Sequence, residues 1–359
     1  MIFVRTTGRG SLDRYSQALA AHLKVPIIDT NIYQQNIKLF NCRWCSRKAL
    51  AAHARDMKFA LRLRQLHSPV HLPNHHLGRY ANALREPFLI TVHDLIRYFD
   101  MRYDTCLIHR PNSRDRILLS LDYRGIRRAA GIIAVSYATK RDLIRYLRVP
   151  PERVFVVYEG VDHSRFCPTD RRIVDQPYVL FVGSEQPRKN LAALLRALRI
   201  IKQRGGHREL RLVKIGGPGG QEDAFRERTL RVVRSLGLEP WVDFAGYVTD
   251  SDLPAYYSGA LCLVLPSLQE GFGLPVIEAM ACQCPVIVSD RGALPEIAGD
   301  AALVTQPDPG HLAEALLAII DDEVLRKSLI TAGLRRAAEF SWERAACETL
   351  RVYETCVPG

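Results

Sequence analysis

The sequence lacks any long apolar run free of charge. None of its 359 residues falls in a stretch of about 18 uncharged apolar residues, so no membrane-spanning helix is predicted. The opening residues 1–8 are too short and too early for a signal peptide and instead indicate a first strand. We therefore expect the protein to stay in the cytoplasm.

Patterns for metal and nucleic-acid binding are also scarce. The nine cysteines are scattered, and Cys42 and Cys45 form a CxxC pair with no second pair beside it. Free thiols are the simpler interpretation, although a metal or redox role with His71, His75 or His76 stays open. The sequence has neither zinc-finger spacing nor an aromatic RNA-binding signature, so nucleic acid is not an expected partner.

Charge is unevenly divided along the chain. The net charge is +12, and residues 1–166 carry 28 Lys and Arg against 13 Asp and Glu, whereas the remainder carries 22 against 25. A basic first half and a nearly neutral second half indicate two domains with different partners. An anionic membrane surface or an acidic acceptor fits the basic half, but a generally Arg-rich composition explains it equally well.

Strand-like and helix-like segments alternate through most of the sequence. In the first half, strands are expected at 1–7, 25–29, 69–72, 87–92, 131–135 and 153–158, and helices at 11–23, 47–66, 114–129 and 137–147. After a polar, proline-containing linker at 163–177, the second half repeats the alternation from Tyr178 and ends in helices at 309–320, 322–339 and 341–355. Such alternation predicts parallel sheets with helices on both faces.

The predicted fold class is therefore α/β, with two Rossmann-like domains whose parallel sheets face a central cleft. We expect an N-terminal domain over residues 1–170 and a C-terminal domain over residues 171–340. The last helix, over residues 341–359, is expected to pack back toward the N-terminal domain.

Residues 270–278, Glu-Gly-Phe-Gly-Leu-Pro-Val-Ile-Glu, carry the most informative pattern in the sequence. They follow the apolar run 260–266, which is typical of a buried parallel strand, and Pro275 suits the first turn of a helix. The backbone N–H groups expected at the carboxyl end of this sheet belong to Gly271, Phe272, Gly273 and Leu274. Open α/β folds bind ligands there, and helix N-termini attract phosphate. A carboxylate beside such a loop suits a ligand with both phosphate and hydroxyl groups, as a nucleotide sugar has.

Other candidate residues also follow predicted strands. Arg188 and Lys189 come after the strand 178–182 and a loop with Gly183 and Ser184, where cations can neutralise a diphosphate. His93 ends the apolar strand 87–92, where its ring can hydrogen-bond a bound sugar. Gly8 and Gly10 precede the helix at 11–23 and let the backbone approach phosphates or the acceptor.

Asp250 and Asp252 form a DxD pattern, which can hold a metal ion through its two carboxylates. They open a predicted helix, so capping of the helix N-terminus is the simpler explanation of these two aspartates.

The second half resembles the family 4 glycosyltransferases, which have the GT-B fold. The resemblance rests on residues 182–191, 244–246, 266–280 and 292–302, and weaker matches occur at Gly8 and Gly10, 91–95, 134–136 and 158–162. It implies a retaining enzyme that uses a nucleotide sugar and needs no metal. The C-terminal domain would then bind the nucleotide sugar, and the N-terminal domain would bind the acceptor. The sequence departs from the family near Ser184, where an arginine often falls, so that Arg188 is the available substitute.

The resemblance also implies individual roles. Lys189 and Arg188 would stabilise the leaving diphosphate, and Glu270 would hold the hydroxyls of the transferred sugar. Glu278, which we expect in the first turn of its helix, would accept from the ribose hydroxyls. The candidate catalytic residues are thus His93, Arg188, Lys189 and Glu270. The candidate donor-binding residues are Gly8, Gly10, Gly183, Ser184, Gly271, Phe272, Gly273, Leu274 and Glu278.

Residues 294–302 resemble bacterial mannosyltransferases of polysaccharide and O-antigen assembly. The expected reaction therefore moves a hexose, with mannose from GDP-mannose preferred over a UDP-sugar. The expected acceptor is a glycan or a lipid-linked glycan at the inner face of the cytoplasmic membrane. A nucleotide-sugar 2-epimerase of the same fold and an inactive sugar-nucleotide-binding protein remain as alternatives.

Overall fold

The computed structural model describes residues 1–8, 10–30, 47–219 and 222–357. The chain divides into two compact units, and each is described here by itself. The first comprises Met1–Thr105, Arg110–Glu159 and Trp342–Gly359, and the second comprises Cys106–His109 and Gly160–Ser341. The CxxC pair at Cys42 and Cys45 lies outside the described residues.

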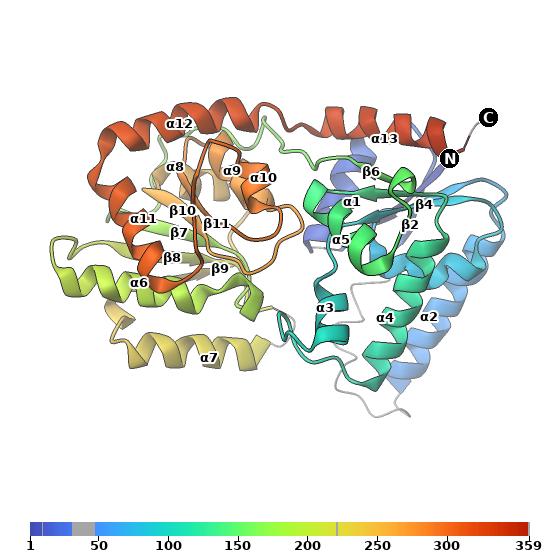
Figure 1. Ribbon diagram of the computed structural model, residues 1–359, viewed down its shortest axis with the longest axis horizontal. Helices are drawn as coiled ribbons and strands as arrows, with labels where there is room; N and C mark the ends of the chain where they lie inside the picture. Colours follow the sequence, from blue (N-terminus) through green and yellow to red (C-terminus); the bar gives the residue numbers. More distant parts are fainter. Residues whose placement is uncertain (9, 31–46, 220–221, 358–359) are drawn as a thin grey trace. The chain divides into compact units, whose positions relative to one another are not determined.

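The first unit is a parallel sheet with helices around it (Figure 1). Its elements are β1 (Ile2–Thr6), α1 (Ser11–His22), β2 (Ile27–Thr30), α2 (Arg47–Arg64), β3 (Val70–Leu72), η2 (His75–Ala83), β4 (Phe88–Val92), α3 (Ile96–Tyr103), α4 (Ser113–Arg128), β5 (Gly131–Ala134), α5 (Tyr137–Leu147), η3 (Pro151–Arg153), β6 (Val154–Val156) and α13 (Trp342–Cys356). The strand order is β2-β1-β3-β4-β5-β6, and every neighbouring pair is parallel.

The central strands of this sheet are apolar because both of their faces are covered. Every residue of β4 and β5 is buried, as expected of a parallel sheet between helix layers. The last helix, α13, packs on α1 through Trp342 and Tyr15, whose ring centroids lie 5.8 Å apart. Its Tyr353 hydroxyl lies 2.7 Å from Nδ1 of His71 in β3. The C-terminal helix is thereby tied to the first sheet.

The second unit repeats the architecture. Its elements are β7 (Tyr178–Val182), η4 (Pro187–Lys189), α6 (Leu191–Arg204), β8 (Arg211–Ile215), α7 (Glu222–Ser235), η5 (Glu239–Trp241), β9 (Val242–Gly246), α8 (Leu253–Gly259), β10 (Cys262–Leu265), α9 (Leu274–Ala281), β11 (Val286–Ser289), α10 (Leu294–Ala298), β12 (Leu303–Thr305), α11 (Pro309–Asp321) and α12 (Glu323–Ala337). In Figure 1, α6 lies beside α11, and α9 lies beside α12.

The strand order in this unit decides which loops meet. The order is β12-β11-β10-β7-β8-β9, again with parallel neighbours. Strand β10 therefore lies between β7 and β11, and the loops that follow these three strands leave the sheet at the same edge. Ligands of open α/β sheets bind outside this carboxyl edge.

The predicted α/β class with two parallel sheets is confirmed. Helix α3 was not predicted from the sequence, because its aromatic residues pack through tertiary contacts. Tyr98 packs edge-on against Tyr123 at a centroid distance of 5.1 Å, and Phe99 packs against Tyr146 at 5.0 Å. No helix among the described residues has the length and apolar character needed to cross a membrane.

Candidate active site

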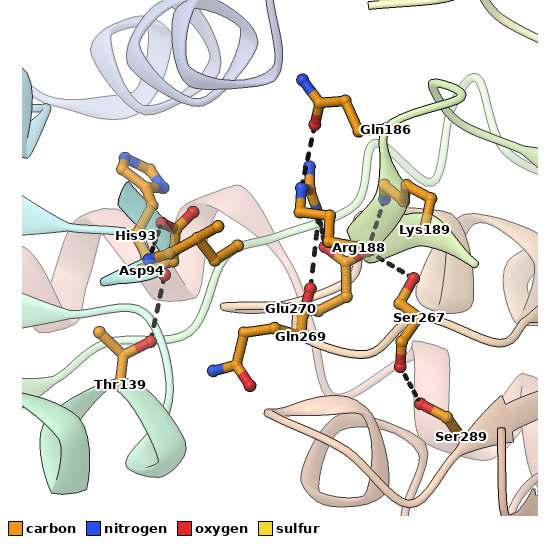
Figure 2. Close-up of polar contacts among 11 residues, drawn as sticks. His93, Asp94, Thr139, Gln186, Arg188, Lys189, Ser267, Gln269, Glu270 and Ser289 are labelled. Carbon is orange, nitrogen blue, oxygen red and sulfur yellow. Dashed lines mark hydrogen bonds and ion pairs between the residues drawn. The ribbon is translucent and has the colours of Figure 1, made fainter. Parts of the chain in front are cut away.

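Glu270 lies at the centre of a cluster of charged side chains in the second unit (Figure 2). Its Oε2 accepts a hydrogen bond from Nη1 of Arg188 at 2.9 Å. Its Oε1 lies 2.6 Å from Nζ of Lys189 and accepts from the Ser267 hydroxyl at 2.8 Å. The three charged side chains are nearly buried, with exposed fractions of 9% for Glu270, 17% for Arg188 and 11% for Lys189. Two cations facing one carboxylate leave an excess positive charge at this edge of the sheet.

The charge of Glu270 is set by this environment. Burial favours the neutral acid, but Arg188 and Lys189 outweigh it and lower the pKa of Glu270 from 4.5 to about 2. The carboxylate is therefore ionised at neutral pH and acts as a hydrogen-bond acceptor. A carboxylate with so low a pKa is unsuited to be a general acid or base.

The loop after β10 accepts hydrogen bonds from the end of β11 and from the loop that follows it. Ser289 donates through its hydroxyl to the Ser267 carbonyl at 2.5 Å (Figure 2), and Ala293 N–H donates to the Glu270 carbonyl at 3.0 Å. Gly292 adopts φ of +60°, and a Cβ at this position would lie 2.5 Å from the Glu270 carbonyl oxygen. The position therefore requires glycine for both conformation and space.

The loop after β7 brings Arg188 and Lys189 to the cluster through the short helix η4. Asn190 ends this helix with φ of +55°, and its side-chain amide donates to the Pro266 and Pro307 carbonyls. Arg188 is further oriented by Gln186, whose Oε1 accepts from its Nε at 3.1 Å. Gly183 begins the same loop, and the Lys189 side chain passes within van der Waals distance of the place where its Cβ would be. Ser184 follows, half-buried.

Helix α9 begins at Leu274, directly after Gly273 in the left-handed region with φ of +104°. Pro275 lies in its first turn, as predicted. The preceding residues Gly271 and Phe272 are buried, and the Phe272 ring packs against Phe340 at 5.9 Å. The amino end of this helix thus lies beside the charged cluster.

The expected position of Glu278 in the first helical turn is wrong. Gly273 occupies the N-cap and α9 begins at Leu274, so its first turn contains no acidic residue and Glu278 lies beyond it. Its buried carboxylate accepts from the Tyr257 hydroxyl of α8 at 2.8 Å. Burial is the largest of the effects that raise the pKa of Tyr257, and the carboxylate of Glu278 adds to it, so the phenol keeps its proton.

The capping explanation of the DxD pattern is also wrong. Asp252 occupies the N-cap of α8 but makes no side-chain bond to the helix backbone. It accepts from the Thr249 hydroxyl and from Nη1 of Arg171, both at 2.6 Å. Asp250 faces Arg165 at 3.4 Å. Each of the two carboxylates therefore forms an ion pair with an arginine. The described residues contain no group of three or more His, Cys, Asp and Glu suited to hold a metal ion.

In the first unit, His93 follows β4 and both of its ring nitrogens are engaged. Nδ1 lies 2.9 Å from Oε1 of Glu159, and Nε2 lies 3.0 Å from the Pro73 carbonyl oxygen. The Tyr15 ring packs edge-on against the imidazole at 4.6 Å. The Thr139 hydroxyl donates to the His93 carbonyl at 3.1 Å (Figure 2). His93 is 6% exposed, so the ring is fixed inside the unit.

Gly8 and Gly10 lie between β1 and α1, as expected. The Asp13 carboxylate accepts from Gly10 N–H at 3.0 Å and lies against Gly8, where a Cβ would meet it at 2.0 Å. Glycine at position 8 therefore allows the acidic side chain to close this turn.

Three side chains that contact the site residues were not predicted from the sequence. Glu159 pairs with His93, Ser267 donates to Glu270, and Tyr257 donates to Glu278. Glu159 and Ser267 lie inside the motifs that carried the resemblance, and their presence there was the available signal. Tyr257 lies in a predicted helix, and its contact with Glu278 depends on how α8 packs on α9.

Two family models match the chain. One described as Glycosyltransferase Family 4 matches residues 6–165, and one described as Glycosyl transferases group 1 matches residues 169–336. The two matches meet near the boundary between the units.

Curated relatives are similar over most of the chain. O-antigen chain mannosyltransferase B of Escherichia coli is 31% identical over 302 residues, which cover 78% of this chain and 78% of that protein. MMP alpha-(1->4)-mannosyltransferase of Mycolicibacterium hassiacum is 32% identical over 67% of this chain and 57% of that protein. D-inositol 3-phosphate glycosyltransferase of Kineococcus radiotolerans is 33% identical over 63% and 57%. The chain spans a little over half the length of the latter two.

Solved structures share the whole fold. Sucrose-phosphate synthase from Thermosynechococcus elongatus superimposes with a TM-score of 0.77 at 23% identity, over 99% of this chain and 98% of that chain. Anabaena HepE in complex with UDP and glucose superimposes with a TM-score of 0.77 at 17% identity, over 99% of both chains.

Proposed function

The chain belongs to the family 4 glycosyltransferases of the GT-B fold, and from this premise we propose that it is a retaining hexosyltransferase whose donor is a nucleotide sugar bound by the second unit. The observation that carries the proposal is the cluster of Glu270, Arg188 and Lys189 beside the amino end of α9. It combines the cations, backbone N–H groups and carboxylate that a sugar diphosphate requires.

In the proposed reaction, Arg188 and Lys189 stabilise the negative charge that grows on the departing diphosphate. Fixed cations in a nearly buried site act strongly because little water screens them. The N–H groups at the start of α9 add the positive end of the helix dipole. The departing diphosphate is itself the base that takes the proton of the acceptor hydroxyl, so that Glu270 is not needed for proton transfer.

Glu270 is proposed to hold the sugar. Among the described residues, Oε1 interacts with two donors, Lys189 and Ser267, and Oε2 accepts from Arg188. A carboxylate offers about four lone-pair positions, so one on Oε2 is left for a sugar hydroxyl. Glu278 is proposed to accept from the ribose hydroxyls, in which case Tyr257 fixes its orientation.

For the donor we favour GDP-mannose. Two of the relatives are named as mannosyltransferases, which supports a mannose donor. A UDP-sugar is the second candidate, because the structure of HepE, which shares the fold, contains UDP and glucose.

For the acceptor we favour a glycan or lipid-linked glycan at an anionic membrane surface. The relative from Escherichia coli is named for the O-antigen chain, which supports a glycan acceptor. In the first unit, α2 exposes Met57 and Leu61 one turn apart, with Lys58 and Arg62 beside them. Exposed apolar and basic side chains on one helix fit the interface of an anionic bilayer.

Donor choice is tested by incubating the protein with GDP-mannose, UDP-glucose and UDP-N-acetylglucosamine, each with and without EDTA. The proposal expects GDP-mannose to raise the melting temperature most and to be hydrolysed slowly without an acceptor, with no effect of EDTA. A shift by UDP-sugars alone would move the donor to the second candidate. If none of the three binds, the proposed function fails.

A further inference from the structure

Lys214, the fourth residue of β8, is a lysine with no exposed surface. All three protons of its ammonium group have acceptors. Nζ donates to Oε1 of Glu185 at 3.0 Å, to the Gly216 carbonyl at 2.6 Å and to the Gly217 carbonyl at 3.0 Å. Glu185 also has a fully buried side chain, and Arg226 of α7 donates to both of its oxygens. The charges are thus paired, but two of them are entirely removed from water.

These contacts join two loops at the carboxyl edge of the second sheet. Glu185 lies in the loop after β7, between Gly183 and η4, and the two carbonyls lie in the loop after β8. Glu185 N–H donates to the Pro218 carbonyl at 2.9 Å, so the loops are also joined through the backbone. Gly216, with φ of +104°, approaches so closely that a Cβ would lie 2.8 Å from the Gly183 carbonyl oxygen.

The joined loop is the one that carries the cations of the candidate site. Three residues separate Glu185 from Lys189, and η4 begins two residues after Glu185. The Lys189 side chain runs past Gly183, which precedes Glu185 by two residues. The backbone that Lys214 holds is therefore the backbone that positions Arg188 and Lys189.

Stability alone does not account for a buried pair of this kind. Moving two charges out of water is expensive, and replacing a buried ion pair by apolar side chains of similar volume is often neutral or stabilising. The neighbours of Lys214 in β8 are apolar, and its place in the strand is one that an apolar residue fills readily. An apolar residue, however, cannot donate the three hydrogen bonds by which Lys214 joins two carbonyls and a carboxylate on adjacent loops.

We propose that Lys214 and Glu185 are positioning residues for donor binding, which hold the loops after β7 and β8 in the geometry that binds the nucleoside diphosphate. The inference rests on the proposed function, since it takes the second unit as the donor site. Neither residue is proposed to take part in bond making. Their effect is on where Arg188 and Lys189 meet the phosphates, and small displacements of such groups are costly.

The test compares the full-length wild type with K214M, the double variant K214M/E185L and V213A. Val213 is the buried neighbour of Lys214 in β8, so V213A is a control for loss of packing in the same strand. Calorimetric titration with GDP and with UDP gives the Kd, thermal unfolding gives the Tm, and hydrolysis of GDP-mannose gives kcat and KM. The wild type is expected to bind GDP or UDP. If it binds neither, the result contradicts the proposed function itself, whereas the positioning role is judged by the variants.

We expect K214M to lower the Tm strongly, because it leaves the Glu185 carboxylate buried without its lysine partner. The double variant should recover most of the Tm and still bind nucleoside diphosphate about tenfold to hundredfold more weakly than wild type. V213A should lower the Tm with an unchanged Kd. A double variant with the Kd and KM of wild type would overturn the proposal and assign the pair to stability alone. The proposal would also be overturned if V213A bound nucleoside diphosphate more weakly in proportion to its loss of Tm, because destabilisation alone would then explain the weaker binding.

Discussion

Nδ1 of His93 lies 2.9 Å from Oε1 of Glu159, and Nε2 of the same ring lies 3.0 Å from the Pro73 carbonyl oxygen. A carbonyl oxygen only accepts, so Nε2 carries a proton, and the carboxylate attracts a second proton to Nδ1. Burial alone lowers the pKa of His93, but Glu159 outweighs it and raises the pKa above its usual value. Glu159 therefore favours the imidazolium form of His93. Its proposed contact with the sugar stays a prediction, and both ring protons already have partners within the first unit.

The first prediction concerns this pair. We expect E159Q to cost about 3–5 kcal/mol of unfolding free energy at pH 6, because it leaves a buried imidazolium without its counterion. A raised histidine pKa stabilises the fold fully below the unfolded-state value near 6.5, and this stabilisation is lost as pH rises through the folded-state pKa. The cost of E159Q should therefore shrink above pH 6.5. Urea unfolding of wild type and E159Q from pH 6 to pH 9 measures this difference in unfolding free energy.

The control for E159Q is D100N. Asp100 is also fully buried and pairs with Arg97 at 3.0 Å, and an arginine does not titrate in this range. Its cost should stay constant from pH 6 to pH 9. A constant cost for E159Q as well would contradict titration of His93 between pH 6 and pH 9.

The second prediction concerns acid stability. The pKa of Glu270 is about 2 instead of 4.5, a difference worth on the order of 3 kcal/mol. A lowered carboxyl pKa stabilises the fold above the unfolded-state value and loses this contribution as pH falls from about 4.5 to about 2. Wild type should therefore lose more stability than E270Q between pH 5 and pH 3, measured by urea unfolding. The exposed E314Q is the control and should follow wild type.

The third prediction concerns the cations. K189A should lower kcat for donor hydrolysis about 10²–10³-fold, the effect of removing one fixed donor from a developing negative charge. The matched control is K327A, which removes an exposed lysine from a surface pair with Glu323 in α12. Equal kcat values for K189A and wild type would remove Lys189 from the proposed mechanism.

The fourth prediction uses two glycines with the same backbone conformation. Gly292 has φ of +60° and Gly237 has φ of +61°, but only the Cβ of an alanine at 292 would collide, at 2.5 Å from the Glu270 carbonyl oxygen. G237A should cost about 1–2 kcal/mol from conformational strain alone. G292A should cost more and should also weaken donor binding, because the Glu270 loop must move. Thermal unfolding and titration with GDP-mannose compare the two. A donor affinity in G292A equal to that in G237A would contradict the role of this contact.

Much of the fold was predictable because its signals are local. The predicted strand at 87–92 and the apolar run at 260–266 correspond to the buried strands Phe88–Val92 and Cys262–Leu265, and the alternation with helical segments predicted the sheet class. Pro275 marked the first turn of α9 because proline lacks the N–H that a helix interior needs. The position of Glu278 was mispredicted because α9 already begins at Leu274, after Gly273 in the left-handed region. Asp252 was mispredicted because Arg171, which is distant in the sequence, binds its carboxylate.

By itself, the sequence determined which residues of the second unit form the candidate site, since Arg188, Lys189 and Glu270 each follow a strand whose identity is encoded locally. Only the tertiary structure decided that Arg188 and Lys189 form ion pairs with Glu270. It likewise decided that Lys214 binds Glu185 in the loop that contains both cations. It also decided that Glu159 lies close enough to His93 to raise the pKa of its imidazole. The physical reason is that ion pairs and pKa values depend on distance and burial, and both depend on the strand order that brings distant loops to one edge of a sheet.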